Sequence, residues 1–374
     1  MRTETGAGMA RHNAVRGTAA ERQATQPEAQ LSSSSLRVTA IGGGTGLSTL
    51  LRGLKQHVPP PTATATDPSK TPAHPILHTI SDLAGIVTVT DDGGSSGRLR
   101  RDMNTLPPGD LRNCMVALSE DEHLLSRLFQ YRFESGAGLE GHNFGNLFLA
   151  GLAEITGDFA LAVKMSSQIL ATRGRLYPAT TQDVTLSAEM DDGSIVYGET
   201  NITASKRRIV RLHMEPAEAH ALPEALEAIA RADLITVGPG SLYTSLITNV
   251  LVTGIADALA AARGLRVYIC NLMTQANESL GLSASQHIER IYDHARAPIF
   301  DCALVNIAPI SPVLLERYAA QGAAPIEADI ARIEALGVRC VPGNFAFEGN
   351  VLRHNYDLVA SELLHLALEH SARQ

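Results

Sequence analysis

The feature that most constrains the fold is a pattern that occurs three times, in which a short β-rich run ends in a glycine-rich loop. The three runs are residues 36–41, 86–90 and 233–237. Further β-rich runs at 266–270, 302–306 and 338–341 are separated by helical patterns. Strands that alternate with helices are typical of parallel sheets with short right-handed connections. We therefore predict an α/β protein with a doubly wound, mainly parallel sheet.

The rest of the chain suggests one large domain with additions. Residues 1–35 are rich in Ala, Arg, Gln, Ser and Thr, which predicts a disordered tail before a domain at 36–372. The Pro, Thr and Ala bias of residues 59–75 predicts a surface insertion. Residues 109–215 are expected to be a mixed section, with a helical block followed by a small antiparallel part. Its hairpin signal is the Asp-Asp-Gly-Ser turn at 191–194.

Composition excludes several classes of protein. The net charge is -8 and no long basic run occurs, so a nucleic-acid partner is not expected. No run of about 18 uncharged apolar residues is present, which argues against membrane insertion. The four cysteines lie far apart, so neither a zinc site nor a disulfide framework is predicted. A cytoplasmic location follows as the expectation.

The first glycine-rich loop is a candidate phosphate site. Without Cβ atoms, its backbone N–H groups can approach a phosphate closely, and the following helix adds its positive dipole end. Thr45 adds a hydroxyl donor. A tight strand-to-helix turn that needs glycine only for its dihedral angles is the alternative. The predicted ligand-binding residues of this loop are Gly42, Gly43, Gly44, Thr45 and Gly46.

The second loop is acidic. Asp91 and Asp92 follow a strand and are candidate ligands of Mg²⁺, with Ser95 and Ser96 as hydroxyl donors and Arg98 as a counter-charge. The alternative is an acidic turn with local Asx hydrogen bonds and Arg98 in solvent. No other metal site is expected.

Three further loops place polar groups at the ends of strands or at the start of a helix. In each case a ligand contact and a purely structural role, such as helix capping or a buried polar turn, are both open. The candidate ligand-binding residues here are Asn146, Gly238, Gly240, Ser241, Asn271 and Thr274.

Taken together and in order, these segments resemble the YvcK/CofD-like family, the gluconeogenesis factors. The resemblance covers about residues 37–368, without the tail and interrupted by the insertion. It rests on IGGGTGLSTLLRGLK, IVTVTDDGGSSGRLR, PPGDLRNCMVALS, FQYRF, GHNFGNLFLAGL, ADLITVGPGSLYTSLITNVLV and NLMTQ. The chain departs from the family pattern at 276–279 and at 143–144.

The resemblance implies a Rossmann-like fold that binds a nucleotide-sugar of the UDP-N-acetylglucosamine type. It also implies a role in cell shape and cell-wall homeostasis during growth on gluconeogenic carbon sources. Thr45, Tyr318 and Arg353 look like the family's nucleotide-sugar contacts. Binding and regulation are favoured over catalysis, with no cofactor required. A homodimer is the family expectation, and the sequence does not identify a regulatory protein partner.

An enzymatic role is the alternative. The CofD branch contains 2-phospho-L-lactate transferases, which move a phospholactyl group from a guanosine diphosphate derivative to a deazaflavin. In that case Asp91 or Asp92 would hold Mg²⁺ against the leaving diphosphate. NAD-dependent chemistry has little support, because no acidic residue stands clearly about 20 residues past the first glycines.

Overall fold

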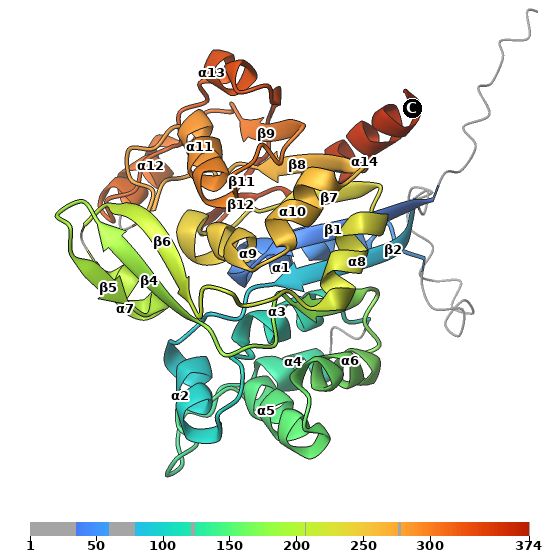
Figure 1. The fold of residues 1–374 in the computed structure, drawn as a ribbon, viewed down its shortest axis with the longest axis vertical. Helices are drawn as coiled ribbons and strands as arrows, with labels where there is room; N and C mark the ends of the chain where they lie inside the picture. The colour runs from blue at the N-terminus through green and yellow to red at the C-terminus, as the bar shows by residue number, and fades with distance from the viewer. Residues whose placement is uncertain (1–34, 60–78, 121–123, 206, 276–277, 374) are drawn as a thin grey trace, which may run out of the picture. The chain divides into compact units, whose positions relative to one another are not determined.

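A central parallel sheet organises the computed structural model, which describes residues 35–59, 79–120, 124–205, 207–275 and 278–373. Its strand order is β10-β9-β8-β7-β1-β2-β3, and every neighbouring pair is parallel (Figure 1). The strands are β1 (Leu36–Gly42), β2 (Ile80–Val87), β3 (Arg175–Pro178), β7 (Leu234–Val237), β8 (Leu265–Ile269), β9 (Cys302–Asn306) and β10 (Arg339–Gly343). The predicted α/β, Rossmann-like sheet is confirmed.

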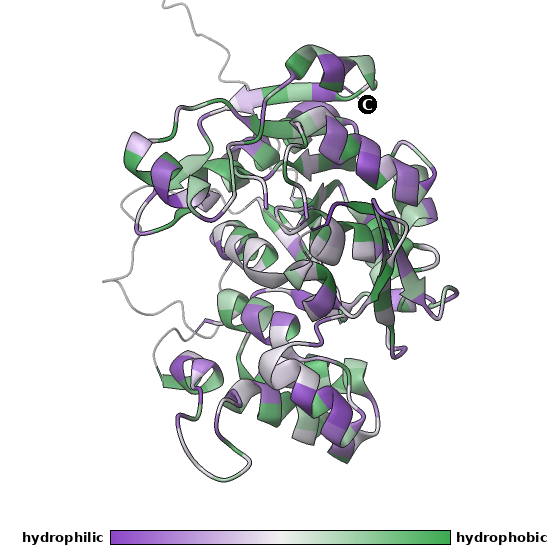
Figure 2. Ribbon diagram, turned by 90° about the vertical axis from the view of Figure 1, so that its left-hand side faces the viewer, coloured by the Kyte–Doolittle hydropathy of each residue, from purple (hydrophilic) through white to green (hydrophobic). Residues whose placement is uncertain are grey.

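Helices cover both faces of this sheet, so the central strands are buried on both sides. All four residues of β7 are buried, and the central strands are mostly green in Figure 2. In Figure 1, α8 (Pro223–Arg231) and α10 (Ile255–Ala261) lie on the near side, and α1 (Gly44–Lys55) and α14 (Tyr356–Ser371) on the far side. The remaining helices of the second half are α11 (Ala284–Ala295), α12 (Pro312–Ala319) and α13 (Ile330–Ala335).

The section between β2 and β7 has the predicted composition. Five helices come first, and an antiparallel sheet of order β5-β4-β6 follows β3. The helices are α2 (Gly94–Met103), α3 (Gly109–Leu118), α4 (Leu124–Gln130), α5 (Phe144–Thr156) and α6 (Phe159–Ile169). The strands are β4 (Thr185–Met190), β5 (Ile195–Tyr197) and β6 (Ile209–Glu215), with α7 (Glu199–Ala204) between the last two. A two-stranded sheet, β11 (Ala346–Glu348) with β12 (Leu352–His354), precedes α14.

The segment after Gly240 is helical but is not one continuous helix. A π-helical segment, η3 (Leu242–Ile247), continues into α9 (Thr248–Leu251) and stops before α10. Val252 has extended backbone and Gly254 has a φ of 98°, so the helical path is broken between α9 and α10. The expected tail at 1–35 and the insertion at 59–75 lie almost wholly outside the described residues.

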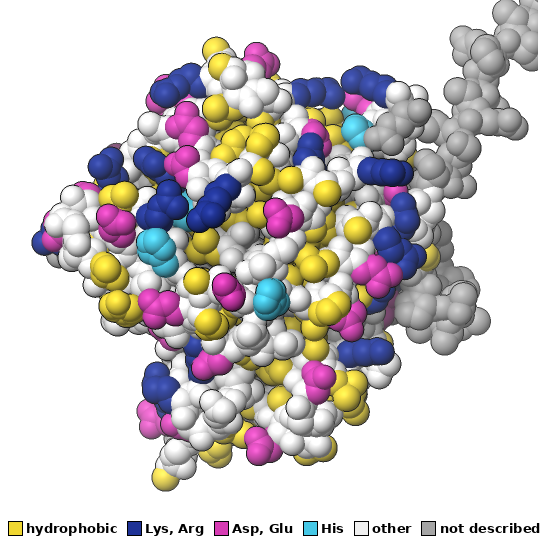
Figure 3. Space-filling view, viewed as in Figure 1, with side chains coloured by type: hydrophobic (Ala, Val, Ile, Leu, Met, Phe, Trp, Pro, Cys, Tyr) yellow, Lys and Arg dark blue, Asp and Glu magenta, His cyan; other side chains and the backbone are white. Residues whose placement is uncertain are grey.

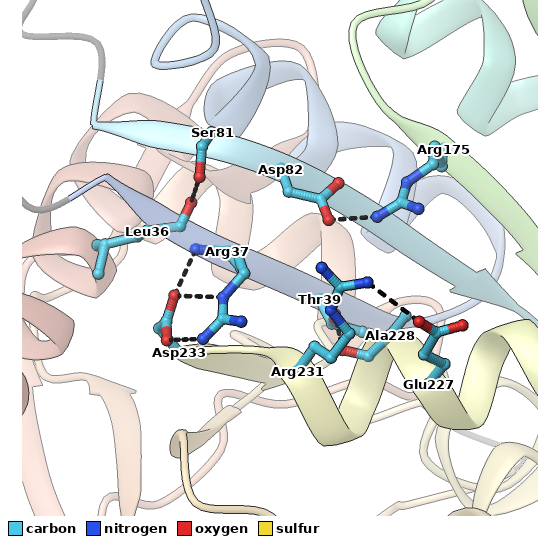
Figure 4. Close-up of polar contacts among 10 residues, drawn as sticks. All are labelled: Leu36, Arg37, Thr39, Ser81, Asp82, Arg175, Glu227, Ala228, Arg231 and Asp233. Atoms are coloured by element: carbon cyan, nitrogen blue, oxygen red, sulfur yellow. Dashed lines mark hydrogen bonds and ion pairs between the residues drawn. The ribbon is translucent and has the colours of Figure 1, made fainter.

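Ion pairs tie the strands together at their amino ends (Figure 4). Asp233, just before β7, accepts bonds from the backbone N–H of Arg37 at 2.8 Å and from its Nη2 at 2.6 Å. Arg266 of β8 binds Asp301 in the same way, through its backbone N–H and its Nε, each at 2.9 Å. These pairs lie at the edge of the sheet opposite to the glycine-rich loops.

Charged side chains of both signs lie on the surface, and the cysteines are buried. On the face that Figure 3 shows, Lys and Arg are interspersed with Asp and Glu. None of the helices in the described part of the chain has the length and apolar character needed to span a bilayer. Cys114, Cys270, Cys302 and Cys340 are buried and unbridged.

Candidate functional site

The turn from β1 into α1 is shorter than the glycine-rich loop suggested, because α1 already begins at Gly44. Gly44 has a φ of 60°, which disfavours a side chain there. A Cβ on Gly46 would lie only 2.2 Å from the carbonyl oxygen of Pro239. Backbone geometry and close packing therefore account for two of these glycines. The same turn still presents Thr45 and Gly46 in the first turn of a helix, where N–H groups have no intrahelical partner.

The loop after β7 is held against the loop after β8 by one asparagine. Asn271 donates from Nδ2 to the carbonyl of Gly240 at 2.6 Å and accepts from the N–H of Gly240 at 3.1 Å. Gln275 donates from Nε2 to the Ser241 hydroxyl at 2.8 Å. Both loops thus form one rigid surface beside Gly46.

A cavity of about 270 Å³ opens at this surface. It lies where the carboxyl ends of β1, β7 and β8 meet, which is where ligands bind in open parallel sheets. The residues predicted from sequence that line it are Thr45, Gly46, Gly240, Ser241, Asn271, Tyr318 and Arg353. The other lining residues are Thr49, Leu50, Pro239, Leu272, Met273, Gln275, Leu352, His354, Tyr356 and Val359. We call this cavity 1.

The far wall of cavity 1 comes from the C-terminal part of the chain. Tyr318 of α12 accepts a bond on its hydroxyl from the N–H of Leu352 at 3.1 Å, which joins α12 to β12. The next residue, Arg353, is exposed. Within the described part of the chain, the Arg353 guanidinium has no hydrogen-bond or ion-pair partner. Its donors are therefore available to an anion in the cavity.

His354 completes this wall as a neutral side chain. Burial lowers the pKa of His354 to about 4, and the bond to the Cys270 carbonyl works in the opposite direction. The His354 Nε2 lies 3.0 Å from the Cys270 carbonyl oxygen. Because a carbonyl only accepts, Nε2 carries the proton and Nδ1 is an acceptor.

Other predicted residues lie outside cavity 1. Thr274 is buried, and its hydroxyl accepts from the N–H of Ala324 at 2.9 Å. Gly238 has a φ of 90° and a Cβ there would lie 2.9 Å from the Ile269 carbonyl oxygen, so its role is conformational. Asn146 is buried, and its N–H donates to the N-cap side chain of Asn143 at 3.2 Å, which is helix capping.

The acidic loop after β2 makes one local turn bond and two contacts with distant segments. Asp91 accepts from the N–H of Gly93 at 2.9 Å, and Asp92 accepts from the N–H of Thr200 at 2.8 Å and from its hydroxyl at 2.5 Å. Arg98 donates to the Glu140 carbonyl at 2.8 Å. Asp91 thus makes the expected Asx contact, whereas Asp92 and Arg98 bind to the start of α7 and to the loop before α5.

The serines of this loop are also bonded within the protein. The Ser95 hydroxyl lies 3.1 Å from His142 Nδ1, and the Ser96 hydroxyl accepts from Asn146 Nδ2 at 3.5 Å. Among the described residues, no group of three or more His, Cys, Asp or Glu side chains is arranged to hold a metal ion. Asp91 and Asp92 are the residues that would hold Mg²⁺ together with the phosphates of a ligand, and we derive no step through a metal.

Two carboxyl groups near this loop have perturbed pKa values. Burial raises the pKa of Asp110 to about 6, although the bond that it accepts from the Gly44 N–H at 2.7 Å opposes the rise. Burial, and then the negative charges of Asp91 and Asp110, raise the pKa of Glu199 to about 9. Glu199 is therefore protonated at neutral pH. Perturbed carboxyl groups of this kind gather at functional sites and also in structural networks.

Sequence reasoning missed three of these residues: Asp110, Glu199 and His354. Asp110 lies in a Pro-Pro-Gly-Asp segment that resembles an ordinary helix start, and Glu199 belongs to the small antiparallel section. Only the tertiary fold brings them to the β1 and β2 loops.

Comparison with known proteins gives the family. The family model "2-phospho-L-lactate transferase CofD" matches residues 38–346. The chain is 46% identical over 328 residues to a gluconeogenesis factor of Halalkalibacterium halodurans, which covers 87% of this chain and 95% of that protein. It is 41% identical over 334 residues to the gluconeogenesis factor of Bacillus subtilis, covering 89% of this chain and 98% of that protein.

Two solved structures agree with this family assignment. The crystal structure of a protein from Bacillus halodurans is similar with a TM-score of 0.81 and 45% identity, covering 88% of this chain and 99% of that one. A second crystal structure of that protein, described as a member of the UPF0052 family, gives a TM-score of 0.80. This chain belongs to the CofD family, and its curated relatives in that family are gluconeogenesis factors.

Proposed function

We propose that this chain binds a nucleotide-sugar of the UDP-N-acetylglucosamine type in cavity 1. Through this binding it acts as a gluconeogenesis factor that affects cell shape and cell-wall homeostasis. The observation that carries the proposal is that Thr45, Tyr318 and Arg353, which are far apart in the sequence, line one cavity. Its place is the cytoplasm, whose reducing conditions suit four free cysteines.

The chemistry of the cavity supports a diphosphate with a base or sugar attached. The free Arg353 guanidinium can pair bidentately with phosphate oxygens, and Thr45 can donate from its hydroxyl. Tyr318 presents an aromatic ring to a base or sugar. At about 270 Å³ the cavity is at the small end of ligand sites, so such a ligand fills it and extends over the adjoining surface.

Isothermal titration calorimetry with UDP-N-acetylglucosamine tests this proposal. Saturable binding is expected for the native chain, weakened at least about tenfold by Arg353→Glu, because charge-assisted bonds contribute about 1.5–3 kcal/mol each. Thr45→Ala should weaken it less. Arg208→Glu is the matched control, since Arg208 is exposed and does not line cavity 1. No heat with any UDP-sugar would sink the proposal.

A transferase of the phospholactyl class is the second candidate. The family match favours it, as do the perturbed carboxyl groups of Asp110 and Glu199 beside the β1 turn. In its Mg²⁺-dependent form, Asp91 or Asp92 would hold the metal against the leaving diphosphate. Turnover of a deazaflavin acceptor with a guanosine diphosphate donor would establish it, and purified protein that gives no product would exclude it.

A further inference from the structure

A second cavity lies toward the C-terminal end of α1, against α4 and the start of α14. We call it cavity 2; its volume is about 580 Å³. Four cationic side chains line it, Arg52, Lys55, Arg127 and Arg173. Glu120 is the one carboxylate among its described lining residues, so these residues carry a net charge of +3 (4 cations minus 1 carboxylate).

The cations of cavity 2 are not equally engaged. Arg173 forms a two-point pair with Glu120, in which Nη2 lies 2.9 Å from Oε2. Lys55 donates from Nζ to the Ser119 carbonyl at 3.0 Å. Within residues 35–59, 79–120, 124–205, 207–275 and 278–373, the Arg52 and Arg127 side chains have no hydrogen-bond or ion-pair partner. Two guanidinium groups from two different helices are thus free to bind an anion at one hollow.

This concentration of positive charge runs against the composition of the protein. The chain has 39 acidic and 31 basic residues, whereas the described lining of cavity 2 has four cations and one carboxylate. Like charges that face one hollow repel each other unless an anion lies between them. A guanidinium matches phosphate oxygens bidentately, and a cavity of about 580 Å³ has the size of a small-molecule site.

We propose that cavity 2 is a second ligand site, which binds a small phosphate-bearing anion through Arg52 and Arg127. Lys55 supplies a third positive charge, and the Arg173–Glu120 pair fixes one wall. The proposal does not depend on the identity of the ligand in cavity 1.

The two cavities share a wall. Tyr356, at the start of α14, lines both of them. A Cβ on Gly53 would lie 2.5 Å from the Tyr356 carbonyl oxygen, so α1 and α14 are in close contact there. The N-terminal turn of α1 lines cavity 1 and its last turns line cavity 2. An experiment on anion binding must therefore separate the two sites.

The test is titration calorimetry of the full chain with inorganic pyrophosphate as the probe. The Arg52→Gln/Arg127→Gln double variant is expected to weaken pyrophosphate binding at least about tenfold, the factor that corresponds to losing 1.4 kcal/mol. Both arginines are exposed, so the variant should fold, and circular dichroism verifies this. Because Arg353 of cavity 1 can also bind pyrophosphate, the variants are compared in an Arg353→Gln background. That background should retain a pyrophosphate site, and the surface control Arg208→Gln should leave it intact.

Three outcomes would overturn the proposal. The native chain shows no pyrophosphate binding; or Arg353→Gln alone abolishes it, which assigns all binding to cavity 1; or Arg208→Gln weakens it as much as the double variant, which indicates general surface charge. Each can be recorded whether or not UDP-N-acetylglucosamine binds, so failure here is distinguishable from failure of the function proposed above.

Discussion

Position 46 has no room for a side chain, because the backbone of the loop after β7 lies against it. The Cβ of an alanine there would lie 2.2 Å from the Pro239 carbonyl oxygen and 3.1 Å from the N–H nitrogen of Gly240. Both contacts are backbone atoms, so the clash cannot be relieved by a rotamer change. Gly46 therefore sets the spacing between the β1 and β7 loops, which form two sides of cavity 1.

Gly46→Ala is expected to lower the free energy of unfolding by about 1–3 kcal/mol, the range for overpacking. The matched control is Gly151→Ala, because that glycine is also helical but a Cβ there meets nothing within 4 Å. The control should stabilise the protein by about 0.5–1 kcal/mol. Chemical denaturation measures both, and equal midpoints for the native chain and Gly46→Ala would contradict the packing argument.

The shifted pKa of His354 predicts how the stability of the protein depends on pH. Its pKa is about 4 in the folded chain, below the ordinary histidine value, so the unfolded chain takes up a proton first as pH falls. The stability that His354 contributes is present above about pH 6.5 and is lost as pH falls toward 4. The loss is at most about 3 kcal/mol, because each pKa unit corresponds to 1.36 kcal/mol.

The His354→Gln variant isolates this effect, since glutamine keeps a donor near the Cys270 carbonyl but does not titrate. Urea unfolding at pH 4.5, 5.5 and 7 should show a smaller pH dependence for the variant than for the native chain. If the two curves are parallel, His354 is not the group responsible.

At the scale of elements, the acidic loop after β2, the start of α3 and the start of α7 bring Asp91, Asp110 and Glu199 together. Burial and the neighbouring carboxylates raise the pKa of Glu199 to about 9 in the folded chain. Between its ordinary pKa and 9 the folded chain binds the extra proton, so this group makes the protein less stable as pH rises. The three elements can pack together because the Glu199 carboxyl group stays protonated and therefore uncharged.

Glu199→Gln, an uncharged near-isostere, should raise the free energy of unfolding by about 2 kcal/mol at pH 8 and have little effect at pH 5. Glu218→Gln, at an exposed glutamate, should be neutral at both values. Thermal unfolding across this range provides the measurement. A native chain that becomes no less stable between pH 5 and 8 would refute the assignment.

Most strands of the central sheet were predictable because their signal is local, but β2 lies at Ile80–Val87 instead of the expected 86–90, and β3 was not predicted. The run that forms β7 is apolar, is bounded by Asp233 and Gly238, and has both faces covered. Element ends were less predictable, because a tertiary contact decides them. Helix α1 begins at Gly44, where the carboxylate of Asp110 accepts the first N–H from 66 residues away. No local pattern around Gly44 contains that information.

The site residues likewise fall into those that local sequence could predict and those that it could not. Glycine and polar residues directly after strands pointed to Thr45, Gly240 and Asn271, which line cavity 1 in the structure. Tyr318 and Arg353 came only from the family resemblance, because a tyrosine on a helix and an arginine in a short strand have no sequence signal of their own. Cavity 2 was not predicted at all, since its arginines become neighbours only when α1 packs near α4.

At the scale of the whole molecule, the amino ends and the carboxyl ends of the strands in the central sheet have different roles. The amino ends are joined by ion pairs such as Arg37 with Asp233 (Figure 4), and hydrogen bonding to Arg37 helps to hold the pKa of Asp233 below its usual value. The carboxyl ends carry the loops of cavity 1. Changes at the two edges should therefore have separable effects on stability and on binding.

Asp233→Ala is expected to lower the free energy of unfolding by about 1–2 kcal/mol, discounted because Arg37 and Asp233 are partly exposed to solvent. It should leave the affinity for UDP-N-acetylglucosamine unchanged. Arg353→Glu should do the reverse, because Arg353 lines the cavity and its side chain bonds to none of the residues that the structure describes. Denaturation and calorimetry on both variants give four values. If Asp233→Ala weakens binding as much as Arg353→Glu does, then the sheet transmits changes from one edge to the other and the two tasks are not separate.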